Sequence, residues 1–395
     1  MGKRRSVRET RLPIIRVQNW NRPGHRLVVC RAAVQYNGAV NNIIIGDSVS
    51  PWQGFRRVAA TPYDAVLIVS FGGPEGPDDV LPFLENVLRG KNVPHPRMLE
   101  VAHHYEQFGG VSPLNAQNRA LIAALERELE DHGPRLPIYF GNRNWRPLLP
   151  DTLRRMRDAG VKRGLAFFTS AYSSYSGCRQ YREDIERSQN QVGPDAPRID
   201  KLRVFFNHPG FIGPMVERVR EALERIPLER RRAARLVFTA HSIPQAMAAN
   251  CRYESQLQEA GRLVASALRH EDWQLVYQSR SGPPSQPWLE PDVCDSLRVL
   301  HEEGITDAVV VPIGFLSDHM EIMFDLDTEA RQLCEQLGLN MVRAGTVGSH
   351  PDFVRMIRQL IVERMEGGER PAMGDFGPSH DVCPADCCLS GRPKA

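Results

Sequence analysis

The chain has 395 residues, of which 42% are hydrophobic and 25% are charged, a composition typical of globular proteins. About two domains are expected at this length, because single hydrophobic cores stop growing beyond roughly 250–300 residues. No apolar run approaches the ~20 residues that a membrane span needs, so we expect a protein without an integral membrane segment.

The net charge of +3 conceals a basic N-terminal region. Residues 1–60 contain 11 Lys and Arg but only 2 Asp and Glu, whereas the rest of the chain is acidic overall. A basic segment can bind nucleic acid or an acidic surface, but chain termini are more often poorly ordered. We therefore expect a basic, poorly ordered extension at 1–61 and no nucleic-acid partner. The region lacks the apolar core of a signal peptide, which favours a cytoplasmic location.

From residue 63 onward, short apolar segments alternate with amphipathic ones. The spacing of apolar residues predicts strands and helices. Before a basic break at 228–233, strands are predicted at 65–71, 137–140 and 164–169, and helices at 78–88, 115–130 and 151–158. After the break, strands are predicted at 235–240, 273–277 and 307–313, and helices at 253–268, 292–303, 328–337 and 352–365.

Strands that alternate with helices of this length predict an α/β fold with parallel sheets built from βαβ units. The basic break predicts two lobes. We place the first lobe at 62–230 and the second at 231–366, with a closing helix at the end of the second. Residues 367–395 are rich in Gly, Pro and Cys and are predicted to form a tail.

Two polar segments directly follow predicted strands of the second lobe. His241 comes after the strand at 235–240, and the segment 314–321, which ends in Glu321, comes after the strand at 307–313. Open parallel sheets bind ligands outside the carboxyl ends of their strands, so the two side chains can face one site. An imidazole and a carboxylate suit Fe2+, which accepts N and O ligands, and a histidine can also act as a base. A purely structural histidine is the alternative.

Three carboxylates recur at intervals of four residues, at Glu321, Asp325 and Glu329. On a helix this spacing places them along one face. Such a row can carry metal ions or protons, and a solvated acidic face is the alternative. Dinucleotide binding is disfavoured because the turn at 71–74 lacks the glycine fingerprint, and the core has no HExxH or CxxC zinc motif.

Several long segments resemble the ferrochelatase family and occur in the family's order. The segments 238–244 and 314–321 resemble its two signatures, 67–90 and 103–119 resemble its N-terminal part, and 141–145, 169–185 and 278–293 resemble its actinobacterial branch. The resemblance covers about residues 63–366. It implies a chelatase-like fold with two Rossmann-like lobes and a porphyrin cleft between them. It also implies a lyase that inserts Fe2+ into a porphyrin in haem biosynthesis.

The resemblance also implies roles for single residues. His241 is expected to be catalytic and Glu321 to be its metal-handling partner, while Asp325 and Glu329 continue as an acidic conduit.

Porphyrin contacts are implied for Tyr105, Ser112 and Tyr181. A helix cap at Ser112 and a half-buried core ring at Tyr181 are the alternatives. The chain departs from some bacterial members at Phe71, which cannot ligate a metal where they carry a tyrosine.

Eight cysteines are present, and three of them cluster near the C-terminus. Without a secretory signal a reducing compartment is expected, so disulfides are not. Some branches of the family hold a [2Fe–2S] cluster with one internal cysteine and three near the C-terminus, which would be Cys178, Cys383, Cys387 and Cys388 here. The adjacent pair is unusual in spacing. Zinc on the same thiolates and a tail with incidental cysteines are the alternatives.

The actinobacterial resemblance points to coproporphyrin III as substrate rather than protoporphyrin IX, and the polar stretch at 91–97 favours the same choice. Porphyrin and ferrous iron are the expected ligands, with hand-off of the product to the next haem-pathway enzyme. Two other functions stay open: a chelatase for another metal, and a non-catalytic porphyrin or haem carrier. A carrier needs the cleft but has no need of His241 and Glu321.

Overall fold

The computed structural model describes residues 35–36, 39–40, 63–90, 93–283 and 285–391. The chain divides into two units, Met1–Ala59 and Ala60–Ala395. In the first unit, β1 (Gln35–Tyr36) pairs antiparallel with β2 (Ala39–Val40). The remainder of the expected extension at 1–61 lies outside the described residues.

The second unit contains two parallel four-stranded sheets with the same strand order. The first has the order β4-β3-β5-β6, with β3 (Ala65–Ser70), β4 (Ile138–Asn142), β5 (Arg163–Phe168) and β6 (Arg198–Lys201). The second has the order β10-β9-β7-β8, with β7 (Arg235–His241), β8 (Trp273–Gln278), β9 (Asp307–Val311) and β10 (Asn340–Arg343). In each sheet the strand that comes first along the chain, β3 or β7, has the second strand on one side and the third on the other. The switch point of each sheet lies between its first and third strands, and such folds bind ligands there.

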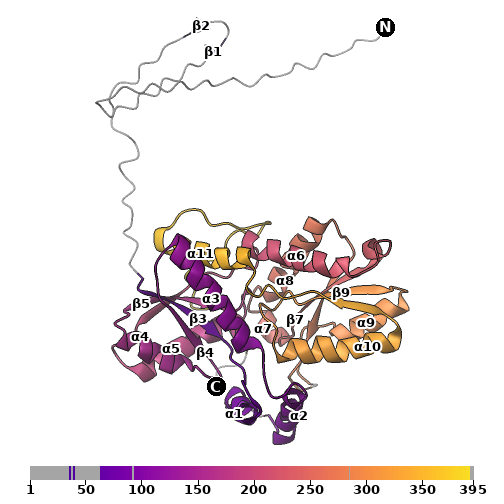
Figure 1. The fold of residues 1–395 in the computed structure, drawn as a ribbon, viewed down its shortest axis with the longest axis horizontal. Helices are drawn as coiled ribbons and strands as arrows, with labels where there is room; N and C mark the ends of the chain where they lie inside the picture. Colours follow the sequence, from indigo (N-terminus) through magenta and orange to yellow (C-terminus); the bar gives the residue numbers. More distant parts are fainter. Residues whose placement is uncertain (1–34, 37–38, 41–62, 91–92, 284, 392–395) are drawn as a thin grey trace. The chain divides into compact units, whose positions relative to one another are not determined.

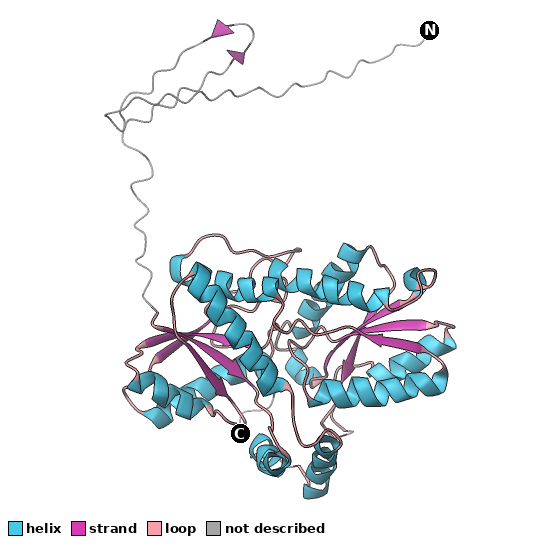
Figure 2. Cartoon of the chain, in the orientation of Figure 1, coloured by secondary structure: helices cyan, strands magenta, loops and turns pink. Residues whose placement is uncertain are grey.

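Helices cover both faces of each sheet (Figures 1 and 2). Around the first sheet lie α3 (Leu114–His132), α4 (Leu149–Asp158) and α5 (Gln180–Val192). The helices α1 (Pro77–Leu88) and α2 (His95–Glu106) pack on each other, apart from the sheet (Figure 1). Around the second lie α6 (Pro209–Glu224), α8 (Tyr253–Leu268), α9 (Val293–Glu302) and α10 (Arg331–Leu337). The helix α11 (Pro351–Glu366) packs against α3 and α6. Short elements are the π-helices η1 (Tyr175–Arg179) and η3 (Ile322–Ala330), the 3-10 turn η2 (Arg231–Ala233) and α7 (Gln245–Ala248).

The central strand β3 explains why the sequence forms such sheets. All six of its residues are buried. Alternate side chains pack on opposite faces, with Leu67 facing α4 and α5, and Ile68 facing α3. A strand covered on both faces is apolar throughout, which is why it stands out in the sequence.

The predicted α/β class with two parallel sheets is confirmed. All six predicted strands are present, with ends within two residues of those expected. The helix expected at 328–337 is corrected, because a π-helix begins at Ile322 and turns into α10 only at Arg331. None of the helices that the structure describes is long and apolar enough to cross a membrane.

Buried contacts join the two sheets. The Tyr172 hydroxyl donates to the Ile313 carbonyl at 3.0 Å, and the backbone N–H of Ser173 donates to Gln256 at 2.7 Å. The buried ion pair of Arg203 with Glu363, at 2.7 Å, ties the segment after β6 to α11. These contacts fix the strand ends of one sheet relative to the other.

Candidate active site

The ends of β7 and β9 bring the two predicted polar segments together. The strands are parallel neighbours, with Phe238 opposite Val311. Beyond them, the Gly314 backbone N–H donates to the Thr239 carbonyl at 3.0 Å. A Cβ on Gly314 would lie 2.6 Å from the Cβ of Ala240, so only glycine allows this close approach. His241 and the segment leading to Glu321 therefore start side by side at the switch point of the second sheet.

His241 and Glu321 form a pair at this point. The His241 Nε2 lies 3.4 Å from the Glu321 Oε1, and both side chains keep access to solvent, with exposed fractions of 32% and 45%. The His241 Nδ1 is hydrogen-bonded to the Ser242 carbonyl. A carbonyl can only accept, so Nδ1 carries a proton and Nε2 is the atom left for a metal or for a transferred proton.

The two members of the pair shift each other's pKa. Burial alone would lower the pKa of His241, but the nearby Glu321 carboxylate raises it to about 9. Burial would raise the pKa of Glu321, but the charge and hydrogen bond of His241 lower it to about 2. At neutral pH the pair is therefore an imidazolium beside a carboxylate. A divalent cation bound by Glu321 competes with the proton on His241.

His319 is a third polar group at the pair that the sequence did not single out. Its Nε2 lies 3.8 Å from the Glu321 Oε2. Burial lowers its pKa, an effect that the Glu321 charge opposes and the His241 charge reinforces. His319 is thus the neutral imidazole of the site. In the sequence, only its position within the segment 314–321 pointed to this residue.

The acidic row continues away from the pair. Asp325 accepts hydrogen bonds from the Ser279 hydroxyl and, at 3.3 Å, from the Gln278 amide. Ser279 has a left-handed backbone with φ of 59°, a rare conformation that is often found at functional sites. Burial, together with the charges of Glu321 and Glu329, raises the pKa of Asp325 to about 7. Sequence reasoning missed Gln278 and Ser279, because neither belongs to a charged pattern.

The outer end of the row meets a surface hollow. Burial, and then the charge of Asp292, raise the pKa of Glu329. Glu329 lines a hollow of about 430 Å³ together with Asp292 and Cys294. The three predicted carboxylates thus lie on one segment that runs from the His241 pair to this hollow.

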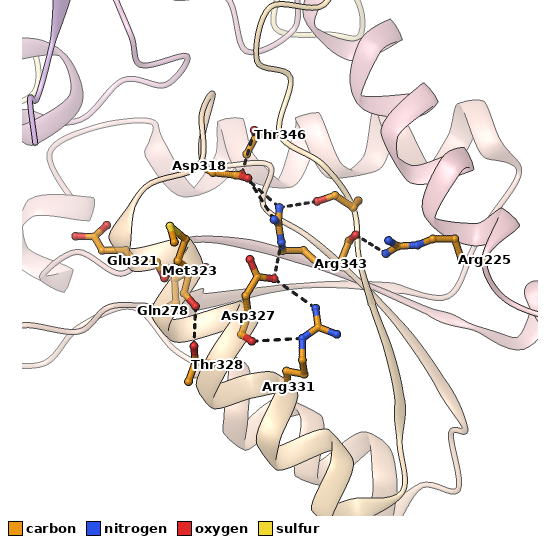
Figure 3. A network of polar contacts seen from close by, with 11 residues as sticks. Arg225, Gln278, Asp318, Glu321, Met323, Asp327, Thr328, Arg331, Arg343 and Thr346 are labelled. Atoms are coloured by element: carbon orange, nitrogen blue, oxygen red, sulfur yellow. Dashed lines mark hydrogen bonds and ion pairs between the residues drawn. The ribbon is translucent and has the colours of Figure 1, made fainter. Parts of the chain in front are cut away.

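Arg343 fixes the segment that carries Glu321 (Figure 3). Its guanidinium contacts Asp318, which precedes Glu321, at 3.2 Å, and Asp327, which follows it, at 2.7 Å. The Asp318 backbone N–H also donates to Gln117 of the first lobe at 2.9 Å. The Glu321 carboxylate points away from this network, so the segment is anchored on one side and presents its acid on the other.

An apolar cluster lies beside the pair. It joins Phe83 of α1 and Tyr105 of α2 with Met320 of the second lobe. The His104 ring stacks on the Phe324 ring with centroids 3.6 Å apart. Burial, and then the Glu321 charge, raise the pKa of Tyr105, so its neutral hydroxyl is near the carboxylate. Of the three residues expected to contact porphyrin, Tyr105 is the one placed beside the pair.

Ser112 and Tyr181 have local partners within the first lobe. Ser112 is buried, and its hydroxyl oxygen accepts from the Leu114 backbone N–H at 3.4 Å, near the start of α3. Tyr181 is buried between Phe168, with ring centroids 5.0 Å apart, and the Arg143 guanidinium, 4.5 Å from its ring centroid. A porphyrin contact at either position stays a prediction.

The C-terminal cysteines meet Cys178. Arg179, next to Cys178 in η1, donates to the carbonyls of Ala385 at 2.8 Å and Cys387 at 2.9 Å, which holds the tail in place. Interaction with the Cys383 thiol, and then burial, raises the pKa of the Cys178 thiol. The Sγ atoms of Cys387 and Cys388 are 3.5 Å apart.

Comparison with known proteins assigns the chain. The family model for ferrochelatase matches residues 63–365. A ferrochelatase of Rhodopirellula baltica is 60% identical over 330 residues, which is 83% of this chain and 94% of that protein. A coproporphyrin III ferrochelatase of Streptomyces griseus is 50% identical over 356 residues, and one of Nocardia farcinica is 49% identical over 345 residues; both matches cover 84% of this chain, and 95% and 98% of those proteins.

The matched residues include the strand ends that hold His241 and Glu321, and the matched family is one of metal chelatases. More narrowly, the chain belongs to the ferrochelatase family and inserts iron into a porphyrin in haem biosynthesis. The carrier and the chelatase for another metal are not favoured.

Proposed function

We propose that the porphyrin binds between the two lobes, against the apolar cluster of Phe83, Tyr105 and Met320, with its centre at His241 and Glu321. The observation that carries this proposal is the 3.4 Å separation of the His241 Nε2 and the Glu321 Oε1 at the switch point of the second sheet. Both side chains remain partly exposed, and an apolar surface next to a polar pair suits a flat macrocycle with a metal-binding centre.

The chemistry requires a proton acceptor and a metal donor on the same side of the macrocycle. Insertion replaces two pyrrole N–H bonds by Fe–N bonds, so two protons leave for each Fe2+ that enters. In the proposed sequence, Fe2+ at Glu321 first releases the proton of His241. The neutral Nε2 then accepts one pyrrole proton and passes it to Asp325, whose pKa is near 7 and which releases it outward; the second pyrrole proton then follows the same route.

Iron is proposed to enter along the acidic row. Support comes from the continuous path of carboxylates from the hollow at Asp292 and Glu329, through Asp325, to Glu321. The raised pKa values of Asp325 and Glu329 mean that a divalent cation relieves the cost of ionising them. The row is thus suited to transient binding of a cation rather than to a permanent metal site.

Coproporphyrin III is the proposed substrate. The support is that relatives about 50% identical to this chain carry that substrate in their names, whereas the Rhodopirellula relative is named only as a ferrochelatase. The test is an anaerobic assay of the full chain with Fe2+ and each porphyrin, followed by loss of free-porphyrin fluorescence. We expect a higher kcat/KM with coproporphyrin III. A higher value with protoporphyrin IX would refute the choice of substrate.

We further propose an iron–sulfur cluster of the [2Fe–2S] type between the first lobe and the tail, with thiolates from Cys178, Cys383, Cys387 and Cys388. The donor set supports this group. Possible ligand atoms of Cys383 and Cys387 lie within 4.8 Å of each other, the Sγ atoms of Cys387 and Cys388 are 3.5 Å apart, and Cys178 interacts with Cys383. Thiolates are the usual ligands of such clusters. When bound, the cluster would cross-link the tail to the first lobe. Cys388 is the fourth thiol of the sequence pattern. Iron and acid-labile sulfide in anaerobically purified protein test the cluster, and zinc alone would contradict it.

We propose that residues 62–230 and 231–366 form two lobes, each of which folds or moves as a unit.

A cytoplasmic location is proposed because every cysteine that the structure describes is a free thiol, as in a reducing compartment. Hand-off of the product to the next haem-pathway enzyme stays a prediction.

A further inference from the structure

An aromatic stack joins α2 to the segment that carries Glu321 and Asp325. The His104 ring of α2 and the Phe324 ring of η3 are within 9° of parallel, and their centroids are 3.6 Å apart, so the two ring faces are in van der Waals contact. Phe324 directly precedes Asp325 and follows Glu321 by three residues. A contact to the Phe324 ring therefore acts on the stretch of chain that presents both carboxylates.

The helices on the His104 side of the stack are fixed to the first lobe. The Trp145 indole N–H donates to Asp79 of α1 at 3.1 Å, and the Asn86 amide, also on α1, donates to the Asn144 carbonyl at 2.8 Å. Both bonds tie α1 to the turn after β4, and α2 packs on α1. His104 therefore projects from a held pair of helices.

The Phe324 side of the stack is a π-helix, a rare conformation that occurs mostly at functional sites. Arg343 contacts Asp318 before this helix, at 3.2 Å, and Asp327 within it, at 2.7 Å (Figure 3). Phe324 lies between these two contacts. The stack on His104 thus adds an attachment between the two that Arg343 provides, and it comes from the other lobe.

The environment of His104 suits stacking. The ring is half-buried, and burial, together with the charges of Arg97 and His103, lowers its pKa, so it is neutral at pH 7. The preceding His103 differs, because its side chain is 68% exposed and pairs with Glu106 at 3.1 Å. Two adjacent histidines of one helix therefore have different surroundings, one packed against the iron segment and one in solvent.

We infer that His104 is a positioning residue, which holds the segment of Glu321 and Asp325 in place for iron through its stack on Phe324. The inference rests on the proposed roles of these carboxylates and goes beyond them, because it assigns part of the geometry of the iron site to a helix of the first lobe. Loss of the stack should weaken iron binding and leave porphyrin binding almost unchanged, since the apolar cluster stays in place.

The test compares His104→Ala, His104→Phe, Phe324→Ala and the double alanine variant with the wild type. His103→Ala is the matched control, and Asp325→Asn is the reference for a direct effect on iron. The kcat and the KM for Fe2+ are measured anaerobically at saturating coproporphyrin III or protoporphyrin IX, whichever the wild type prefers. Fluorescence titration without iron gives the Kd for that porphyrin, and thermal unfolding shows that each variant is folded.

His104→Ala should raise the KM for Fe2+ about 2- to 10-fold, the equivalent of one aromatic pair, with kcat and the porphyrin Kd within about twofold of the wild type. Phe324→Ala should have the same effect, and the double variant no further one, because both substitutions remove one contact. His104→Phe should restore the wild-type KM, since it keeps a stacking ring but no ligand atom, and His103→Ala should not change it.

Additive losses in the double variant, or a raised KM that persists in His104→Phe, overturn the inference. A raised porphyrin Kd with an unchanged KM for Fe2+ in His104→Ala also overturns it, because His104 then contacts the porphyrin instead. In each case a raised KM in Asp325→Asn leaves the proposed iron route standing. A wild-type KM in both Asp325→Asn and His104→Ala refutes the proposed route and this inference together.

Discussion

The two lobes have the same strand order but carry different chemistry at their switch points. In the first lobe, β3 is followed by Phe71, a 38% exposed ring that lies 6.3 Å from Phe83 and 5.8 Å from the Arg143 guanidinium. In the second lobe, the equivalent strand ends in His241, and the segment after β9 supplies Glu321. Topology thus sets where a ligand binds, and a few side chains set what is done to it.

Because of this difference, we assign separate parts of the proposed reaction to the two lobes. The first lobe presents apolar and aromatic surface, which suits the macrocycle. The second presents an imidazole and a row of carboxylates, which suits the metal ion and the released protons. Substitutions at the second switch point should therefore affect iron, and equivalent substitutions at the first should not.

The largest effect is expected for Glu321→Gln. Iron insertion should fall by at least about 100-fold, the low end of what a positioned acid–base group contributes. The pKa of His241 should drop from about 9, because the carboxylate that most strongly opposes the effect of burial is lost. Stopped-flow porphyrin fluorescence measures the rate, and histidine NMR measures the pKa. The exposed Glu302→Gln of α9 is the matched control, and equal rates in the two variants would contradict the role of Glu321.

A smaller effect is expected for Asp325→Asn. The KM for Fe2+ should rise on the order of 10-fold, as for a group that supports a metal ligand, while kcat at saturating iron changes less. In the wild type the KM for Fe2+ should fall as the pH rises through about 7, because the carboxylate forms there. The variant should lose that dependence. A KM that keeps the wild-type pH profile would remove Asp325 from the iron route.

The same variant predicts a change in stability. The folded-state pKa of Asp325 is raised to about 7, above its unfolded value near 3.9, so ionisation costs stability as the pH rises between the two values. Asp325→Asn should therefore raise the free energy of unfolding at pH 8 relative to the wild type and have little effect at pH 4. Urea unfolding at both pH values measures it, and a pH-independent difference would contradict the buried carboxylate.

Arg343→Met should have a moderate effect on both stability and activity. It removes the guanidinium that Asp318 and Asp327 share and leaves Asp327 with Arg331 alone, which should cost about 1–3 kcal/mol of stability, and it loosens the segment that carries Glu321. We expect a severalfold loss of kcat with porphyrin affinity unchanged, and partial rescue by Arg343→Lys, which restores the charge but not the fork. Loss of porphyrin binding instead would place the role of Arg343 elsewhere.

The smallest effect is expected for Phe71→Tyr in the first lobe. An exposed conservative substitution should change the rate by less than about twofold. If the added hydroxyl raised the affinity for Fe2+ markedly, the first lobe would share the metal chemistry, and the division between the lobes would be wrong. Equilibrium titration with Fe2+ under anaerobic conditions decides between these outcomes.

The sequence predicted the parts of the fold that have strong apolar patterns. β3 and β9 are buried over their whole length, and such runs are clear in the sequence. The edge strands β6 and β10 were missed, because each has four residues and only part of each is buried. Helix α2 was missed because its mixed composition, in which Pro, His, Arg and Glu interrupt the apolar residues, gives a weak periodicity.

The site was predictable where chemistry follows a strand, as at His241 and Glu321. The residues that were missed act through tertiary contacts. Gln278 and Ser279 reach Asp325 from β8 and the turn after it, and Arg343 reaches Asp318 and Asp327 from the end of β10. Such contacts depend on where strands lie in the sheet, and no local pattern reveals them. The π-helix η3 likewise left no signal.

The most direct test of the central claim is single-turnover iron insertion by His241→Ala under anaerobic conditions, with porphyrin binding measured in the same samples. We predict that the variant binds coproporphyrin III as the wild type does but forms no iron porphyrin on the wild-type time scale. Insertion at the wild-type rate would contradict the account, because His241 Nε2 would then neither accept the pyrrole proton nor help to hold the iron.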